Sequence, residues 1–239
     1  MSHHSILHKY FFLTISIFMM LFAINVHSKS GHIEAGAIIE HGNTESKSYY
    51  GSIKKEHIIS NKAKNIFNSR AENKEENYVR SKEEYRLNNQ TRYLFTDFNY
   101  TFLELEYVSD RYGGYNYRSS ETIGLGRKLI KKDNIDLILQ SSAGLRQSET
   151  SDDIKQDGWV IRFASNLDLK LKNDLFFEQN IDLSIDDNNI ITKSNTNLKL
   201  IILKSFYFKL DFSLEHKKNV PSDIKNTDSR MILVIGYEM

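Results

Sequence analysis

The chain of 239 residues contains no cysteine and one proline, Pro221. The absence of cysteine excludes a disulfide framework, thiolate metal sites and a cysteine nucleophile. It also excludes a lipid anchor attached to an N-terminal cysteine. Any structure that this chain forms must therefore be held together by packing, hydrogen bonds and ion pairs.

The sequence also lacks an excess of charge of either sign. Lys and Arg number 32 against 31 Asp and Glu, so there is no electrostatic reason to expect the phosphate neutralisation on which nucleic-acid binding depends. Hydrophobic residues make up 40% of the chain and aromatic residues 12%, which is enough to bury a core. We expect a folded protein that does not bind nucleic acid.

An apolar segment at the N-terminus is organised as a secretory signal peptide. Tyr10 to Ile24 is almost entirely apolar, Lys9 precedes it, and Val26-His27-Ser28 supplies suitable residues for cleavage after Ser28. We expect residues 1–28 to be the signal peptide and residues 29–239 to be one domain. The alternative is a retained anchor, although this core is shorter than the ~20 residues that a spanning helix prefers.

The rest of the chain has no long run at helical spacing, and instead alternates apolar and polar residues with period two. Trp159, Ile161 and Phe163 fall on one face of such a segment, whereas Arg162 and Asp168 fall on the other. This alternation is typical of a strand with one apolar and one polar face. Marking the interruptions predicts twelve strands, at 32–41, 46–58, 62–72, 78–88, 92–107, 115–130, 134–147, 158–171, 174–186, 190–203, 205–217 and 226–239.

The predicted connections alternate in length. Asn61, Asn88 to Thr91, Lys131 to Asp133, Lys172 to Asn173 and Lys204 are short, whereas Glu72 to Asn77, Val108 to Gly114, Ser148 to Asp157 and Lys218 to Lys225 are mostly longer. Short turns at one end and long loops at the other are typical of bacterial outer-membrane barrels. One-faced strands can satisfy their backbone groups in lipid only if the sheet closes. We therefore predict an all-β fold, an antiparallel up-and-down transmembrane barrel of about twelve strands.

The C-terminal residues support the same topology. Met231, Leu233, Ile235, Tyr237 and Met239 share one face, and this alternating end resembles the C-terminal signal that the outer-membrane assembly machinery reads, except that Met239 stands where that signal usually carries Phe. We expect outer-membrane lipid and this machinery to be the partners. The structural alternative is a soluble periplasmic barrel that binds a ligand among inward-facing apolar residues.

Two regions depart from the pattern. The outer face of the second to fourth strands includes Lys55, Asn65, Ser69, Ser81 and Glu83, and a charge on the lipid face at mid-bilayer costs of order 2 to 4 kcal/mol. Either these strands extend beyond the bilayer or this flank does not face lipid. In the fifth strand, Phe98, Tyr100 and Phe102 are followed by Leu103, Leu105 and Tyr107. That change of face predicts a bulge near Phe102.

Four short motifs occur in a fixed order along the predicted strands. They are Gly42-Asn43-Thr44, Asp110-Arg111-Tyr112-Gly113-Gly114, Gly124-Leu125-Gly126 and Gly144-Leu145-Arg146. In order and spacing they resemble the salt-induced outer membrane proteins, a family defined by a domain of unknown function. The resemblance implies an outer-membrane location and a link to salt or osmotic stress. It supplies no catalytic residue.

The candidate functional residues are the charged side chains of the polar strand faces, which we expect to line the lumen. They are Arg118, Arg146, Arg162, Asp168, Lys170, Glu178, Asp182, Lys193, Lys199, Lys209, Asp211, Glu215 and Arg230. Charges of both signs either interlock and fill a barrel of this size or line a narrow aqueous path. Their near-balance argues against strong ion selectivity. Glu104 and Glu106, two apart on one face, are interpreted as further lumen or rim charges.

We find no pattern that predicts catalysis. The histidines have no partner at metal-ligand spacing, and Ser213 and His216 fall on opposite strand faces, which does not suit a hydrolytic triad. We therefore predict a non-catalytic outer-membrane barrel of the Gram-negative envelope, without cofactor or metal. The alternatives are a narrow channel for small solutes or ions, a soluble periplasmic ligand-binding barrel and, least favoured, an outer-membrane hydrolase. The sequence leaves the oligomeric state open.

Overall fold

The computed structural model describes residues 30–40, 46–112, 114–187, 189–219 and 226–239. The predicted signal peptide lies outside these residues. Among them, no helix is long and apolar enough to cross a membrane. The strands are β1 (Ser30–Glu40), β2 (Ser46–Ile58), β3 (Ala63–Glu76), β4 (Val79–Leu94), β5 (Asn99–Asp110), β6 (Tyr115–Lys132), β7 (Ile135–Thr150), β8 (Lys155–Lys170), β9 (Leu175–Asp186), β10 (Ile190–Leu203), β11 (Phe206–Lys217) and β12 (Thr227–Glu238).

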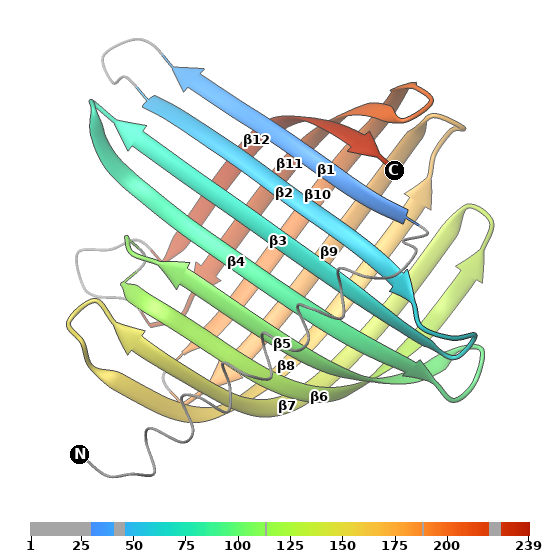
Figure 1. The fold of residues 1–239 in the computed structure, drawn as a ribbon, viewed down its shortest axis with the longest axis horizontal. Coiled ribbons are helices and arrows are strands. Elements are labelled where there is room, and N and C mark those ends of the chain that lie inside the picture. The colour runs from blue at the N-terminus through green and yellow to red at the C-terminus, as the bar shows by residue number, and fades with distance from the viewer. Residues whose placement is uncertain (1–29, 41–45, 113, 188, 220–225) are drawn as a thin grey trace.

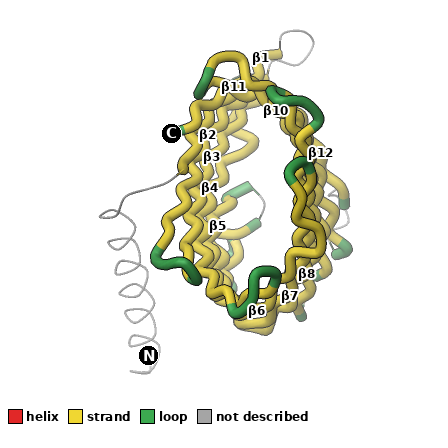
Figure 2. Tube along the Cα trace, turned by 90° about the vertical axis from the view of Figure 1, so that its right-hand side faces the viewer, coloured by secondary structure: helices red, strands yellow, loops and turns green. Residues whose placement is uncertain are grey.

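The twelve strands form one closed barrel. Each strand pairs antiparallel with its neighbours in sequence, and β1 pairs with β12 to close the sheet (Figure 1). After a quarter turn the strands outline an oval ring (Figure 2). β1 begins and β12 ends at the same end of the barrel, which we call the terminal end, and the other end is the distal end. The predicted all-β, up-and-down barrel of twelve strands is confirmed.

The barrel is apolar outside and polar inside. On β12, Met231, Leu233 and Ile235 point outward with about half of each side chain exposed, at 55%, 57% and 56%. Glu72, Glu104, Lys209 and Asp211, in contrast, are buried in the interior. This distribution is the reverse of that in a soluble carrier with an apolar cavity, and it suits a wall that faces hydrocarbon.

The connection between β4 and β5 was predicted at the wrong place. Asn88 to Thr91 was predicted to be a turn, but these residues lie within β4, and the turn is formed by residues 95–98. The polar side chains are satisfied within the sheet. Asn65 on β3 donates hydrogen bonds to Asn89 (3.0 Å) and Thr91 (2.9 Å), and Gln90 donates one to Glu104 (2.5 Å). Hydrogen bonds to partners on other strands therefore hold Asn88 to Thr91 in a strand, although the sequence of this run resembles a turn.

This new boundary also removes the predicted bulge at Phe102. The pairing of β5 with β4 is regular throughout, and its only irregularity against β6 lies between Val108 and Asp110. Tyr100 and Phe102 are only 1% and 4% exposed because both point inward, whereas Leu103 points outward. The fifth strand therefore keeps one alternation, with Tyr100 and Phe102 in the lumen and Tyr107 on the outer face.

Of the four connections predicted to be long, three are short in the structure and only the one near Lys218 to Lys225 is long. β3 continues through Glu76, so that the connection predicted at Glu72 to Asn77 is a two-residue turn of Asn77 and Tyr78, with φ of 50° and 63°. Positive φ at both central residues is typical of a type I′ hairpin turn. The connections 111–114 and 151–154 at the distal end are no longer than 59–62 and 95–98 at the terminal end. By the strand bounds, the distal connections 41–45 and 218–226 are longer.

The polar flank on β2 to β4 is accounted for mainly by strand length. β4 has 16 residues, more than the ~9–11 that cross a bilayer. Ser81 and Glu83 lie near its distal end, whereas Lys55 and Asn65 lie near the terminal end of their strands. Ser69 is the member of this group that lies at mid-strand. Extension beyond the bilayer is therefore the explanation that the strand bounds favour.

The seam between β1 and β12 is the shortest ladder of the barrel. The paired residues run from His32 to Gly36 on β1, opposite Glu238 to Val234 on β12. On its other side, β1 pairs with β2 along its whole length, from Ser30 to Glu40. The distal half of β1 therefore has a ladder partner on one side only.

Candidate functional site: the lumen of the barrel

The thirteen predicted lumen residues all lie on inward strand faces, where some meet opposite charges and others do not. The structure brings into ion pairs Arg146, Arg162, Asp182, Lys193, Lys209, Asp211, Glu215 and Arg230. The others make no ion pair within the described residues: Arg118, Asp168, Lys170, Glu178 and Lys199. Arg118 lies over the ring of Tyr115, and Lys199 over the rings of Phe176 and Tyr207. The sequence did not identify which charges would interlock.

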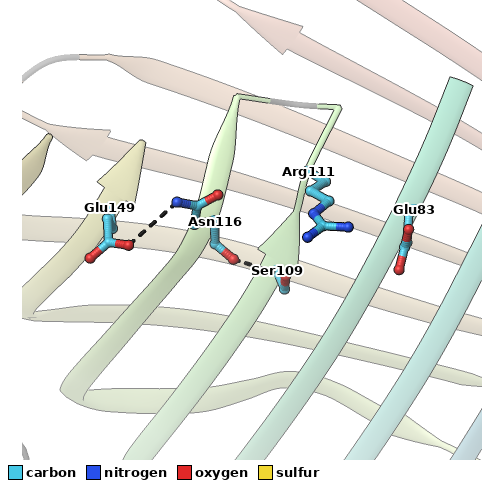
Figure 3. A pocket seen from close by; sticks show the side chains of 5 residues that line it. All are labelled: Glu83, Ser109, Arg111, Asn116 and Glu149. Atoms are coloured by element: carbon cyan, nitrogen blue, oxygen red, sulfur yellow. Dashed lines mark hydrogen bonds between the residues drawn. The ribbon is translucent and has the colours of Figure 1, made fainter. Parts of the chain in front are cut away.

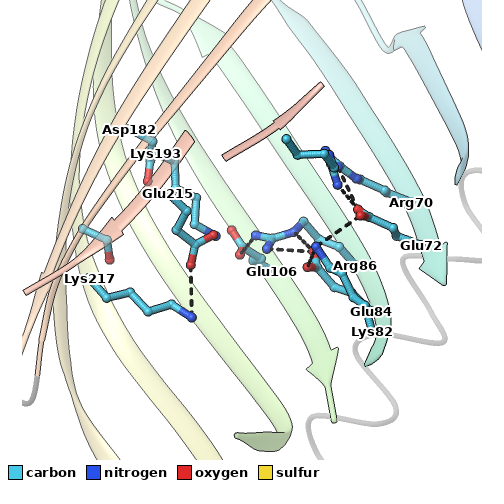
Figure 4. A network of polar contacts seen from close by, with 12 residues as sticks. Arg70, Glu72, Lys82, Glu84, Arg86, Glu106, Asp182, Lys193, Glu215 and Lys217 are labelled. Atoms are coloured by element: carbon cyan, nitrogen blue, oxygen red, sulfur yellow. Dashed lines mark hydrogen bonds and ion pairs between the residues drawn. The ribbon is translucent and has the colours of Figure 1, made fainter. Parts of the chain in front are cut away.

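A network of ion pairs crosses the middle of the lumen. Arg162 on β8 pairs with Glu104 and Glu106 (3.1 Å) on β5, three strands away around the wall, and with Asp182 (3.0 Å) on its neighbour β9. Glu106 also accepts a hydrogen bond of 2.8 Å from Arg86 on β4 (Figure 4). These side chains connect β4 and β5 to β8 and β9 through the interior, so they narrow the lumen at this height.

A second junction forms around Glu72, which is only 2% exposed. Its carboxylate pairs with Arg70 (3.2 Å) on the same strand, with Lys82 (3.3 Å) on β4, and with Arg230 on β12. The last of these pairs connects residues that are 158 positions apart in sequence. One carboxylate therefore holds three cationic groups and links β3 to the last strand.

A third junction lies near the terminal end around Glu34. Its carboxylate accepts hydrogen bonds from Tyr50 (3.2 Å) and Ser52 (3.0 Å) on β2, and from Tyr207 (2.8 Å) and Lys209 (2.6 Å) on β11. Such charge-assisted bonds are stronger than neutral ones. Glu34 therefore bridges, from inside, the strands on both sides of the β1–β12 seam.

Two tyrosines fill the lumen next to glycines on the neighbouring strand. A Cβ added at Gly126 would lie 2.1 Å from the ring of Tyr100, and one added at Gly236 would lie 2.1 Å from the ring of Tyr207. Both rings are almost fully buried. The glycines of the Gly124-Leu125-Gly126 motif therefore serve packing inside the lumen, and no helix follows them that could bind a phosphate.

We expect Gly126→Ala to lower the free energy of unfolding by about 1–3 kcal/mol, the typical cost of overpacking. Tyr100→Ala should largely remove that penalty when added to Gly126→Ala, because the clash is with the tyrosine ring. The measurement is the urea midpoint of the folded barrel in detergent. An unchanged midpoint in the single variant would show that Tyr100 moves aside at no cost.

Small cavities lie between charged side chains in the distal part of the lumen. Two cavities there, one between Arg118 and Arg146 and one between Arg86 and Lys193, each have a volume of about 20 Å³, which is room for about one water molecule. A larger hollow of about 490 Å³ lies on the outer side of the distal rim, lined by Glu83, Ser109, Arg111, Asn116 and Glu149 (Figure 3). Because Glu83, Ser109 and Glu149 are outward-facing positions, this hollow does not belong to the lumen.

Sequence reasoning missed part of the lumen. Glu34, Arg70, Glu72 and Arg86 lay within predicted strands, but the candidate list was drawn only from Arg118 onward, where the alternation is cleaner. In the structure their even-numbered positions form the inward face of β1, β3 and β4. The hydrolase alternative gains no support from the described residues. Within the described part of the chain, no three His, Cys, Asp or Glu side chains are arranged to hold a metal ion. Ser213 and His216 face opposite sides of β11, and His216 contacts Thr227 instead.

A closed antiparallel barrel with an apolar exterior and a charged interior defines the class of outer-membrane β-barrels. Solved structures of that class are similar to this chain. The NanC porin is 10% identical, with a TM-score of 0.55 over 86% of this chain and 97% of that one. An outer-membrane channel from Pseudomonas putida F1 is 7% identical, with a TM-score of 0.52 over 88% and 94% of the two chains. At such low identity these likenesses support the fold alone.

Within this class, the chain belongs to the family described as protein of unknown function, DUF481, whose model matches residues 33–239. A relative from Escherichia coli (strain K12), the uncharacterized protein YdiY, is 24% identical over 218 residues, which are 87% of this chain and 82% of that protein. The expected family membership is therefore confirmed.

Proposed function

We propose that this protein is a narrow outer-membrane channel for small ions, closed at mid-lumen by ion pairs that must separate before ions can pass. The observation that carries the proposal is the ion pairing of Arg162 on β8 with Glu104 and Glu106 on β5, which spans the interior of a polar lumen between strands that are not neighbours. A wall of fixed charges of both signs gives permeating ions weak binding sites, which conduction requires. The near-balance of these charges suits a pore with little overall preference for one sign.

Ionic strength is the natural variable for such a closure. The Debye length falls from about 10 Å at 0.1 M salt to about 3 Å at 1 M, so ion pairs reached by lumen water weaken as salt is added. The link to salt or osmotic stress that the resemblance implies would then have a physical basis. We further propose insertion by the outer-membrane assembly machinery after cleavage of the signal peptide, contact with outer-membrane lipid, and no catalytic activity.

The test is conductance in planar bilayers. The double variant Arg162→Gln/Glu106→Gln removes one charge of each sign from the network that crosses the lumen, so the lumen keeps its balance while this connection is lost. We expect the single-channel conductance to rise several-fold. The conductance of the wild-type protein should rise more than in proportion to salt concentration.

The matched control is Lys74→Gln/Glu76→Gln. This pair also carries one charge of each sign, but both residues lie on β3 near the distal rim, so their pairing does not cross the lumen. We expect the control to conduct like the wild type. If the wild type and the Arg162/Glu106 variant were both silent while migrating as folded barrels in unheated gels, the proposal would fail and a permanently filled lumen would replace it.

A further inference from the structure

Five oxygen-bearing side chains lie next to one another around the inner wall. Asp136 on β7 is directly opposite Asp168 on β8, Asp168 is opposite Glu178 on β9, Glu178 is opposite Asn197 on β10, and Asn197 is opposite Asp211 on β11. All five are inward-facing positions, and we call them the acidic row. The row begins at the terminal end, at the second residue of β7, and reaches the middle of β11.

Such a row is an unfavourable arrangement on its own. Directly opposed like charges on neighbouring strands destabilise a sheet. Other lumen carboxylates, such as Glu72, Glu104 and Glu106, have an arginine or lysine within 4.0 Å. Among the described residues, Asp136, Asp168 and Glu178 have no lysine or arginine nitrogen within that distance. Three adjacent carboxylates are therefore left without a paired cation in a lumen that pairs most of its charges.

An independent observation shows missing partners at the same place. The Oδ1 atoms of Asp136, Asn197 and Asp211 are buried and accept no hydrogen bond, and within the described chain they are all of the buried carboxylate and amide oxygens in that condition. That of Asp211 faces Arg230 at 3.8 Å, so those of Asp136 and Asn197 are the ones with neither a donor nor an ion pair. Asn197 is only 7% exposed, and its Nδ2 donates to Glu178 at 3.4 Å. Its amide is therefore held at the row with its oxygen unpartnered. Buried acceptors without a donor call for a ligand that supplies positive charge or protons.

The cations around the row leave room for such a ligand. Lys131 is opposite Asp136 across the sheet, Lys54 and Lys199 are the cationic groups that act on Asp168, and Arg230 lies 3.8 Å from Asp211. Lys170 follows Asp168 by two residues on the inward face of β8. None of the four lysines contacts the carboxylates of the row, so they lower its negative field without occupying the space beside its oxygens.

We propose that the acidic row binds a hydrated divalent cation of the Mg²⁺ class. Hard oxygen ligands suit this class, and Mg²⁺ usually keeps several of its waters and contacts proteins through one or two carboxylates. Binding through water also agrees with the absence, in the described part of the chain, of three acidic groups that converge on one point. The site goes beyond the proposed channel and does not depend on conduction.

The probe is Mn²⁺, added to the folded full-length mature barrel in detergent, with the free ion followed by electron paramagnetic resonance. We expect the wild-type protein to remove Mn²⁺ from solution and added Mg²⁺ to release it. Asp168→Asn/Glu178→Gln should weaken this binding at least five-fold. Lys131→Gln should strengthen it, because that lysine lowers the negative field at Asp136. The matched control is Asp228→Asn, an exposed carboxylate at the distal end of β12, which should bind as the wild type does.

A stability measurement keeps the inference testable if Asp168→Asn/Glu178→Gln folds poorly. Mg²⁺ should raise the urea midpoint of the wild type, whereas without divalent cations Asp168→Asn should itself raise that midpoint by removing repulsion, and it should respond less to Mg²⁺. If the wild type did not bind Mn²⁺, or if the wild type and the double variant bound it equally, the inference would be overturned. Water alone would then be the partner of the oxygens of the acidic row. Because none of these measurements needs a conducting pore, its failure is distinct from failure of the channel proposal.

Discussion

Phe163→Arg should make assembly of the barrel less favourable by about 2–4 kcal/mol, the cost of an arginine on the lipid face near mid-bilayer. Phe163 lies in the middle of β8, points outward and is 49% exposed. The measurement is the folded fraction in phospholipid vesicles as a function of urea, read from the migration of unheated samples in gels. A loss of this size would leave little folded protein under conditions in which the wild type is half unfolded.

The control for depth is Leu171→Arg. Leu171 directly follows β8 at the terminal end and is 52% exposed, so the same new side chain would lie near the membrane interface. There the cost is about 0–1 kcal/mol. Equal penalties at the two positions would contradict the assignment of this face to lipid, because a soluble barrel has no dependence on depth.

Glu72→Gln should be the most damaging change of a single charge inside the barrel. The substitution leaves Arg70, Lys82 and Arg230 without the carboxylate that they share. Removing one partner of a buried ion pair typically costs about 3–5 kcal/mol, since the remaining charge stays buried and uncompensated. The expected result is a lower urea midpoint in vesicles, together with slower folding if the link from β3 to β12 assists closure.

Glu76→Gln on the same strand is the comparison for Glu72→Gln. Glu76 pairs with Lys74, but its side chain is 43% exposed, and exposed pairs contribute only about 0–1 kcal/mol. Its midpoint should stay close to that of the wild type. If Glu72→Gln had an equally small effect, water in the lumen would already screen the charges that meet at Glu72.

The sequence predicted the second half of the barrel better than the first, for a physical reason. From β8 onward, runs such as Trp159, Ile161 and Phe163 alternate cleanly, and the predicted bounds of β10, 190–203, match Ile190–Leu203. In β3 and β4 the outer face carries Asn65, Asn89 and Thr91, which hydrogen-bond to each other across the strands. A polar residue satisfied by a distant strand has the same local pattern as one in a turn, so local periodicity could not separate the two.

The site shows the same limit. Alternation sufficed to place Arg162 and Asp182 on an inward face, because this requires only the parity of one strand. The pairing of Arg162 with Glu104 depends on the curvature of the whole barrel, which brings β8 and β5 within reach of each other. The acidic row likewise depends on the register of β7 to β11, which no single segment specifies.

The short ladder between β1 and β12 makes this seam the natural place for the wall to part. With backbone pairing confined to His32–Gly36 on β1, separation of the two strands breaks few hydrogen bonds. The bonds from Glu34 to Tyr207 and Lys209, and from Glu72 to Arg230, reach across the seam through the lumen. Lateral opening of the wall is therefore coupled to these ion pairs. Any condition that weakens them also makes the separation of β1 from β12 easier.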